Sequence, residues 1–245
     1  MKSSEKVNFI SNWIKEYVNN MSSKALSLVI GVSGGIDSSV SSTLCAMTGL
    51  KTIVLSMPIK QKSDQYDLSL KHKEWLVKRF KNVEAHTVNL DKLFSSFTSS
   101  LSNFDNEHGM ANSRARLRMT TLYQVAAANK GIVVGTGNKV EDFGVGFYTK
   151  YGDGGVDISP IADCNKTEIW EIGKELGILK DIIEAVPTDG LWDDGRTDEG
   201  QLGLKYSELE EAMNNPKSPN RDKYELIRKQ NLHKMEPIPV CKIPN

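Results

Sequence analysis

Residues 26–40, LSLVIGVSGGIDSSV, decide the fold of this chain. They open with an apolar run over residues 26–32 that is rich in β-branched side chains and has the length of a buried strand. The sequence SGG at residues 33–35 ends the run, and a helix-forming segment begins at Ile36. The pattern therefore predicts a strand, a glycine-rich turn and a helix N-terminus in immediate succession.

A junction of this kind is suited to binding an anion. Unpaired backbone N–H groups converge at the start of a helix, and the helix dipole adds partial positive charge. Gly34 and Gly35 allow the backbone to approach a phosphate closely. Ser33, Ser38 and Ser39 add hydroxyl donors. We therefore expect a phosphate group to lie against this turn.

Asp37 is the unusual member of the turn, because a carboxylate repels a phosphate unless a cation lies between them. We therefore interpret Asp37 as a Mg²⁺ ligand. A Walker A motif is excluded because GxxxxGK[ST] occurs nowhere in the chain, and the turn lacks the GxGxxG dinucleotide-binding fingerprint. The alternative is a tight turn in which the glycines serve geometry alone, and SGGxDS after a buried strand disfavours it.

Composition limits the class of protein. The 245 residues are enough for one substantial core, so we expect a single domain over residues 1–245, with an extended tail over about 236–245. Lys and Arg number 31, as do Asp and Glu, so no basic field indicates a nucleic-acid partner. Three dispersed cysteines without a CxxC pair suit a reducing compartment. The absence of a membrane-spanning stretch and of a signal-peptide core completes the expectation of a cytoplasmic protein without a membrane partner.

Hydrophobic periodicity along the rest of the chain predicts alternating strands and helices. Asn165 or Asp163 is expected to cap one helix that Gly177 ends. This order predicts an α/β fold with a doubly wound, Rossmann-like parallel sheet of about five strands flanked by helices. Strands are expected at residues 26–32, 52–58, 83–90, 131–137 and, as a short fifth, 158–161, and helices at 5–21, 36–47, 65–80, 112–129, 166–176, 206–213 and 221–234.

Two glycine-rich segments and a group of arginines lie outside this regular pattern. Residues 143–157 and 182–203 are expected to be loops that close over a ligand, the alternative being disorder without function. Arg114, Arg116 and Arg118 fall in the first turns of the helix expected at 112–129, where the dipole disfavours cations. They indicate an anionic ligand or an acidic partner, or else a solvated helix face.

The SGGxDS turn resembles the PP-loop of the N-type ATP pyrophosphatases, which cleave ATP between its α and β phosphates. Further motifs extend the resemblance over residues 5–240 to one family, the ammonia-dependent NAD synthetases, and imply an adenine nucleotide alpha hydrolase-like core. The motifs, in chain order, are GVSGGIDSS, NSRARLRMTTLYQVAAA, GTGNKVED, FYTKYGDGGVDISPIAD, NKTEIW, PTDGLWD, TDEGQLG and HKM.

The resemblance implies a site residue by residue. Mg²⁺ would be held by Asp37 and Glu141, with ATP as co-substrate. Family members are homodimers, and the dinucleotide lies near the subunit interface. ATP would contact the phosphate turn and three further positions, Gly31, Val32, Ser33, Gly34, Gly35, Ile36, Asp37, Ser38, Thr136, Lys166 and Thr188, and deamido-NAD would contact Arg116, Lys150, Asp157, His233 and Lys234.

Two departures from the family pattern stand out. The segment between Glu141 and Lys150 is one residue longer, which affects the register of Glu141 relative to Lys150. Arg114 stands where the family often carries a Lys, which keeps the charge.

The implied reaction amidates deamido-NAD (nicotinic acid adenine dinucleotide) to NAD, the last step of NAD biosynthesis. The nicotinate carboxylate attacks the α-phosphate of ATP, pyrophosphate leaves, and ammonia then attacks the acyl-adenylate and releases AMP. We take Asp153 as the candidate catalytic residue that accepts a proton from ammonium, the alternative being that it only fixes a tight turn. Free ammonia is expected because no stretch remains for an amidase domain.

Rival interpretations are other PP-loop enzymes, a nucleotide-binding module and an interaction protein. A tRNA-thiolating enzyme would ordinarily show a basic face or paired catalytic cysteines, and a GMP-synthase-like enzyme would lack TKYGDGGVD and HKM. A non-enzymatic module of the universal-stress type would need neither Asp37 nor Glu141. A pure interaction protein is favoured only by the amphipathic helix expected at residues 5–21.

Overall fold

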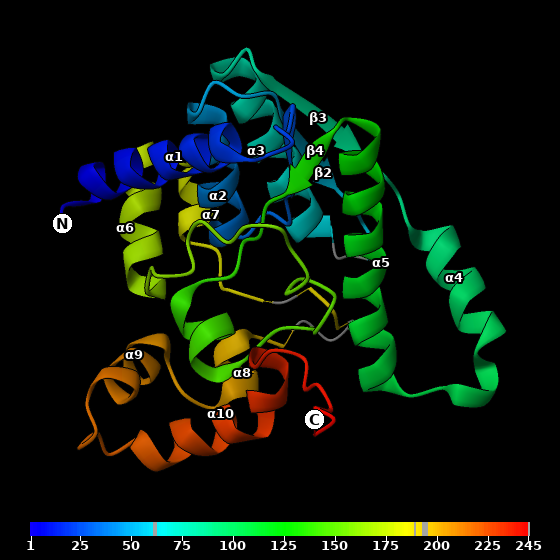
Figure 1. Ribbon diagram of the computed structural model, residues 1–245, viewed down its shortest axis with the longest axis vertical. Coiled ribbons are helices and arrows are strands. Elements are labelled where there is room, and N and C mark those ends of the chain that lie inside the picture. The colour runs from blue at the N-terminus through cyan, green and yellow to red at the C-terminus, as the bar shows by residue number, and fades with distance from the viewer. Residues whose placement is uncertain (61–62, 189, 193–195, 245) are drawn as a thin grey trace.

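The computed structural model describes residues 1–60, 63–188, 190–192 and 196–244. Strands and helices alternate over the first half of the chain, and the second half is mainly helical (Figure 1). The elements are α1 Ser3–Asn20, β1 Ser27–Gly31, α2 Ile36–Met47, β2 Thr52–Ser56, α3 Ser63–Arg79, β3 Val83–Thr87, α4 Asp91–Ser100, a 3₁₀ turn Ser102–Phe104, α5 Glu107–Ala128, β4 Gly131–Val133, a π-helix Lys139–Val145, α6 Lys166–Leu176, α7 Lys180–Ile183, α8 Asp198–Leu202, α9 Tyr206–Asn214 and α10 Arg221–Met235.

Within the residues that the structure describes, the sheet has four parallel strands in the order β3-β2-β1-β4. β1 is therefore central, and the strand order reverses beside it, between the β1–β2 and the β1–β4 pairs. The short fifth strand expected at 158–161 is reduced to one parallel bridge between Val134 and Ile158. Pro160 follows and has no N–H to continue a ladder. The expected doubly wound α/β architecture is confirmed.

Both faces of the sheet are covered by helices, as the alternation of side chains along β1 requires. Leu28 and Ile30 pack in one apolar cluster with α1, α2 and α6. Val29 belongs to a second cluster with residues of α4 and α5 on the opposite face. Because all three side chains are fully buried, β1 reads as a continuous apolar run, which is typical of parallel sheets.

A third cluster lies beyond the carboxyl end of the sheet. It joins the π-helix to α8, α9 and α10, which form the lower layer of Figure 1. Val140 of the π-helix packs there with Leu202, Leu209 and Tyr224. This layer brings the C-terminal third of the chain close to the ends of β1 and β4.

The structure corrects the start of the long helix. α5 begins at Glu107 rather than at 112, because the Asn106 side chain caps it by accepting a hydrogen bond from the Gly109 N–H at 2.7 Å. Arg114 therefore lies two turns into the helix. The dipole argument that singled out the three arginines was wrong.

The connecting segments also differ from expectation. The expected loop 143–157 begins inside the π-helix, which ends at Val145. The expected loop 182–203 contains α8, and its residues 189 and 193–195 lie outside the described residues. Residues 237–244 form neither helix nor strand. Within the described ranges, the helices lack the length and apolar character of a membrane span.

Candidate active site

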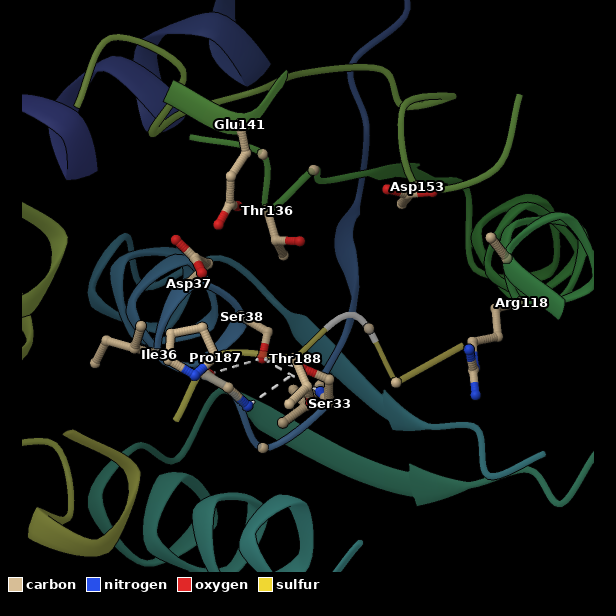
Figure 2. A pocket seen from close by; sticks show the side chains of 18 of the residues that line it. Ser33, Ile36, Asp37, Ser38, Arg118, Thr136, Glu141, Asp153, Pro187 and Thr188 are labelled. Atoms are coloured by element: carbon tan, nitrogen blue, oxygen red, sulfur yellow. Dashed lines mark hydrogen bonds between the residues drawn. The ribbon is translucent and has the colours of Figure 1, made fainter. Parts of the chain in front are cut away.

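The phosphate turn follows β1 and is organised by two serines. The Ser33 N–H donates to Ser38 Oγ at 3.2 Å, and the Gly35 N–H donates to Ser33 Oγ at 3.2 Å. Figure 2 shows this hydrogen-bonded loop at the floor of the pocket. Gly34 has φ +92°, which a side chain would strain, so the turn requires glycine here.

Helix α2 begins directly after the turn. Its N-cap residue is Gly35, which has no side chain to accept a hydrogen bond. The N–H groups of the first turn therefore donate no hydrogen bond to an N-cap side chain. Asp37 lies in this first turn. A carboxylate there is favoured by the helix dipole, and it projects toward the cavity above the turn (Figure 2).

The cavity has a volume of about 280 Å³ and lies at the carboxyl ends of the strands. It is lined by all the positions expected to contact ATP or metal and by the candidate base, namely Gly31, Val32, Ser33, Gly34, Gly35, Ile36, Asp37, Ser38, Thr136, Glu141, Asp153, Lys166 and Thr188. These residues come from five separate parts of the chain. The structure therefore brings this expected set together.

The centre of the site is a buried lysine between two carboxylates. Lys166 Nζ lies 2.5 Å from Asp37 Oδ2 and 2.9 Å from Glu141 Oε1. Asn138 Nδ2 also donates to both, at 3.1 Å to Asp37 Oδ1 and 2.6 Å to Glu141 Oε2. Asn138 is fully buried at the N-terminus of the π-helix. Its amide thus fixes the separation of the two carboxylates.

The charge state of this centre follows from its neighbours. Burial by itself lowers the pKa of Lys166, but the Asp37 and Glu141 carboxylates outweigh burial and raise that pKa. Lys166 is therefore a permanent cation in the pocket. Burial also raises the pKa of Asp142 well above its usual value, and the nearby Asp153, Glu141 and Asp37 carboxylates raise it further.

Gly137 makes room for Asp142. A Cβ at Gly137 would lie 2.0 Å from Asp142 Oδ2, so no larger residue fits the GTG turn in this conformation. The second glycine-rich turn, expected after β4, thus allows the Asp142 carboxyl group to lie close to the backbone.

Asp153 lies at the rim of the cavity (Figure 2). Its Oδ1 accepts a hydrogen bond from the Thr149 N–H at 3.0 Å, and the Gly152 N–H donates to the Thr149 carbonyl at 2.9 Å. The side chain is exposed. It therefore fixes a tight turn and also faces the pocket, so its role as a base stays a prediction.

The positions expected to contact deamido-NAD are not found among the described residues that line the cavity. Four of them meet on a neighbouring surface. Arg116 Nε donates to the Lys150 carbonyl at 3.2 Å, Lys150 Nζ donates to the His233 carbonyl at 3.1 Å, and Lys234 Nζ donates to the Tyr148 carbonyl at 2.8 Å. The Thr149 N–H, next to Lys150, donates to Asp153 Oδ1, so this surface adjoins the rim of the cavity.

Asp157 has a different environment. Its Oδ2 accepts from the Val133 N–H at 2.7 Å, and its Oδ1 accepts from the Tyr123 hydroxyl at 3.1 Å. Burial and the Asp157 carboxylate raise the pKa of Tyr123 to about 12, so this phenol stays a donor. Asp157 extends the hydrogen bonding of β4, and its contact with the dinucleotide stays a prediction.

The three arginines also have structural partners. Arg114 is buried, donates to the Leu191 carbonyl at 2.8 Å and stacks on Phe94. Arg118 Nε donates to the Met57 carbonyl at 3.0 Å, and its side chain lines the cavity (Figure 2). Of the three, Arg118 is the one that the structure places in the pocket.

Sequence reasoning missed three polar residues of the centre, Asn138, Asp198 and Tyr206. The Tyr206 hydroxyl donates a hydrogen bond to Glu141 Oε1 and lies 3.1 Å from Asp198 Oδ2. Asn138 and Asp198 stand inside the motifs GTGNKVED and TDEGQLG, and that position was the available signal. Tyr206 lies in no such motif, so nothing in the sequence marked it.

Comparison with known proteins gives concordant relatives. The chain is 37% identical over 215 residues to the NH(3)-dependent NAD(+) synthetase of Carboxydothermus hydrogenoformans, covering 85% of this chain and 84% of the relative. It is 36% identical to that of Alkaliphilus oremlandii, covering 96% and 95% of the two chains.

Solved structures agree in fold. The NMN synthetase of Francisella tularensis superposes with a TM-score of 0.88 at 31% identity, covering 100% of this chain and 99% of that one. An NH3-dependent NAD synthetase of Campylobacter jejuni superposes at 0.79, covering 99% and 100%, and at 23% identity shows the fold alone. The sequence model of the NAD synthase family matches residues 6–243, and the chain belongs to this family.

Proposed function

We propose that this chain catalyses the ATP-dependent amidation of deamido-NAD to NAD by ammonia, through an acyl-adenylate, with release of pyrophosphate and AMP. The observation that carries the proposal is the convergence of Asp37, Glu141 and Lys166 above a phosphate turn at the carboxyl end of β1. The family assignment supports a ligase that forms a C–N bond.

In the first step the nicotinate carboxylate attacks the α-phosphate of ATP. This step brings anions together, so neutralising negative charge is the main catalytic task. The first-turn N–H groups of α2 and the Ser33 hydroxyl would hold the phosphates, and the Lys166 ammonium would offset their charge. Thr136 and Thr188 lie on opposite walls and would contact the rest of ATP (Figure 2).

The two carboxylates fit a Mg²⁺ ion. Asp37 and Glu141 both reach one cationic group, Lys166 Nζ, so both can reach one ion. In the described part of the chain no three acidic, histidine or cysteine side chains come together as a metal site. A hard ion would thus complete its coordination with phosphate oxygens and water. When bound, Mg²⁺ would supply Lewis-acid neutralisation of the phosphate charge.

In the second step ammonia attacks the acyl carbon and AMP leaves. Asp153 would accept the proton that ammonium gives up. Because water would hydrolyse the adenylate, the segment 143–155 and the described residues 185–188 and 190–191, which contribute to the pocket lining, would exclude it. We infer a homodimer in the cytoplasm, with deamido-NAD near the subunit interface and in contact with Arg116, Lys150, Asp157, His233 and Lys234.

A second candidate substrate is nicotinate mononucleotide. The superposition on a protein described as an NMN synthetase, at 31% identity over 100% of the chain, favours it. Both substrates present the same nicotinate carboxylate to ATP, so the pocket chemistry is shared. The difference lies in the adenylate half, which only the dinucleotide carries.

The test is product formation with ATP and Mg²⁺ from each pyridine nucleotide, with ammonium or with glutamine. NAD from deamido-NAD and ammonium alone is the expected result. A larger kcat/KM with the mononucleotide would assign the second candidate. Pyrophosphate without either amide product would contradict both substrates and keep only the ATP chemistry.

A further inference from the structure

Tyr206 reaches the charged centre from a different layer of the fold. It is the first residue of α9 and packs in the cluster formed by the π-helix and helices α8–α10. Its ring is 2% exposed, yet its hydroxyl contacts two carboxylates, Glu141 Oε1 and Asp198 Oδ2. Lys166 Nζ lies 4.9 Å from the centre of the same ring.

The Tyr206 hydroxyl is placed to donate a hydrogen bond to either carboxylate. A phenol has one proton, so it can donate to only one of the two carboxylates at a time. The position of Asp198 therefore affects how strongly Tyr206 holds Glu141.

Asp198 in turn is tied to the wall of the ATP pocket. Its N–H donates to the Pro187 carbonyl at 3.2 Å, next to Thr188. The Tyr206 N–H donates to Glu199 Oε1 at 3.0 Å, so α8 holds Tyr206 at both its backbone and its hydroxyl. These contacts connect Pro187 through Asp198 and Tyr206 to Glu141, with the phenol proton shared between the two carboxylates.

We propose that Tyr206 is a positioning residue for the metal-binding carboxylate, holding Glu141 in place and coupling it through Asp198 to the Pro187–Thr188 wall. This inference rests on the proposed role of Glu141 in binding Mg²⁺. Groups that orient the ligands of a metal typically contribute about 10- to 100-fold to metal affinity. Tyr206 would thus act through Glu141 and not on the substrate.

The test uses Mn²⁺ as a spectroscopic substitute for Mg²⁺. Mn²⁺ binding to the full chain is measured by electron paramagnetic resonance in the presence of an ATP analogue that cannot be cleaved between its α and β phosphates. Tyr206→Phe keeps the ring and removes the hydroxyl, and is expected to weaken Mn²⁺ binding by about tenfold. In turnover it should raise the Mg²⁺ concentration for half-maximal rate and leave KM for deamido-NAD unchanged.

Tyr224→Phe is the matched control. Tyr224 is a second buried tyrosine of the same cluster, and its hydroxyl donates to the Gly144 carbonyl at 3.3 Å, away from Glu141. The Tyr224→Phe variant is expected to bind Mn²⁺ with the same affinity as the unchanged chain. Asp198→Asn, which can still bond the phenol, should bind Mn²⁺ more tightly than Asp198→Ala.

Glu141→Gln separates failure of this inference from failure of the metal role. If Glu141→Gln weakens Mn²⁺ binding and Tyr206→Phe does not, the metal role stands and the positioning role is overturned. If Glu141→Gln itself leaves Mn²⁺ affinity unchanged, both are overturned. Equal weakening by Tyr206→Phe and Tyr224→Phe would assign the effect to the packing of the cluster and also overturn the inference.

Discussion

Two buried lysines show how differently this protein uses the same side chain. Lys166 is 2% exposed and lies between Asp37 and Glu141. Lys73, in α3, is 6% exposed, and its Nζ donates to neutral oxygens, the His86 carbonyl at 3.0 Å and Thr87 Oγ1 at 2.6 Å. Burial lowers the pKa of Lys73, whereas the two carboxylates raise that of Lys166.

The difference separates a structural cation from a functional one. Lys73 connects α3 to β3 through hydrogen bonds to uncharged oxygens. Burying its ammonium group away from water costs free energy that no carboxylate among the described residues offsets. Lys166 is held by a pair of carboxylates that could themselves hold Mg²⁺, at the one end of the sheet where the cavity opens. Replacing each lysine by the same residue therefore compares the two uses directly.

The largest effect is expected on activity. Lys166→Met should lower the rate of pyrophosphate release by about 10³-fold, because it removes a preorganised charge from the phosphate site. Lys73→Met should change that rate by less than about threefold. Release is measured with ATP, Mg²⁺ and deamido-NAD, and similar losses in both variants would erase the distinction.

Stability should separate the two lysines next. Lys166→Met leaves Asp37 and Glu141 facing each other without a cation, and is expected to lower the free energy of unfolding by about 3 kcal/mol. Lys73→Met removes hydrogen bonds to neutral groups, at about 1 kcal/mol. Denaturant unfolding of both variants measures this. The comparison breaks if Lys73→Met is the more damaging change.

His72 extends the comparison to pH. It is fully buried beside Ser42, its Nε2 lying 3.0 Å from Ser42 Oγ, and burial lowers its pKa to about 4. Between pH 6.5, the ordinary pKa of histidine, and about pH 4, the unfolded chain binds the His72 proton more readily than the folded chain does. The free energy of unfolding therefore falls as the pH falls through this window. The loss at about pH 5 should be about 2 kcal/mol, and His72→Gln should abolish it. Thermal unfolding of both chains at about pH 7.5 and about pH 5 tests this, and an equal pH dependence would contradict it.

Asp153 should give the smallest and most selective effect. Asp153→Asn keeps an oxygen that can accept from the Thr149 N–H, so the turn should survive. We expect amidation to fall by about tenfold and adenylation to stay within about twofold. Quenched-flow measurement of pyrophosphate and of amide product distinguishes the steps. An equal loss in both would leave Asp153 with only its turn-forming role.

Local sequence patterns were sufficient where the chain determines its own structure. The helix after the phosphate turn runs over Ile36–Met47 as expected, and α6 runs over Lys166–Leu176, with Asn165 at its N-cap position and Gly177 in the left-handed conformation at its end. In α6 the N-cap position and the glycine stop agree with the sequence pattern, and in α2 the start of the helix directly after the glycine turn agrees with it. The Asn106 cap lies ahead of the segment expected to be helical, so the start of α5 was misplaced.

The candidate site divides in the same way. The resemblance supplied Asp37, Glu141 and Lys166 as separate positions, but not that one ammonium bridges both carboxylates. Tyr206 was missed altogether, because its relation to Glu141 spans 65 residues and depends on how α9 packs against the π-helix. Contacts of this kind arise from tertiary packing, and no local pattern encodes them.

The sequence separation of the bridge has a consequence for biosynthesis. Asp37 and Lys166 are 129 residues apart, whereas β1, β2 and β3 all lie within residues 27–87. During translation the residues of β1, β2 and β3 are therefore synthesised long before Lys166, the cation that pairs with Asp37. Until Lys166 is present, the Asp37 carboxylate needs water as its partner. Water therefore cannot be excluded from the carboxyl end of the sheet before that point. Full charge compensation at the nucleotide site is thus expected only after Lys166 has been synthesised.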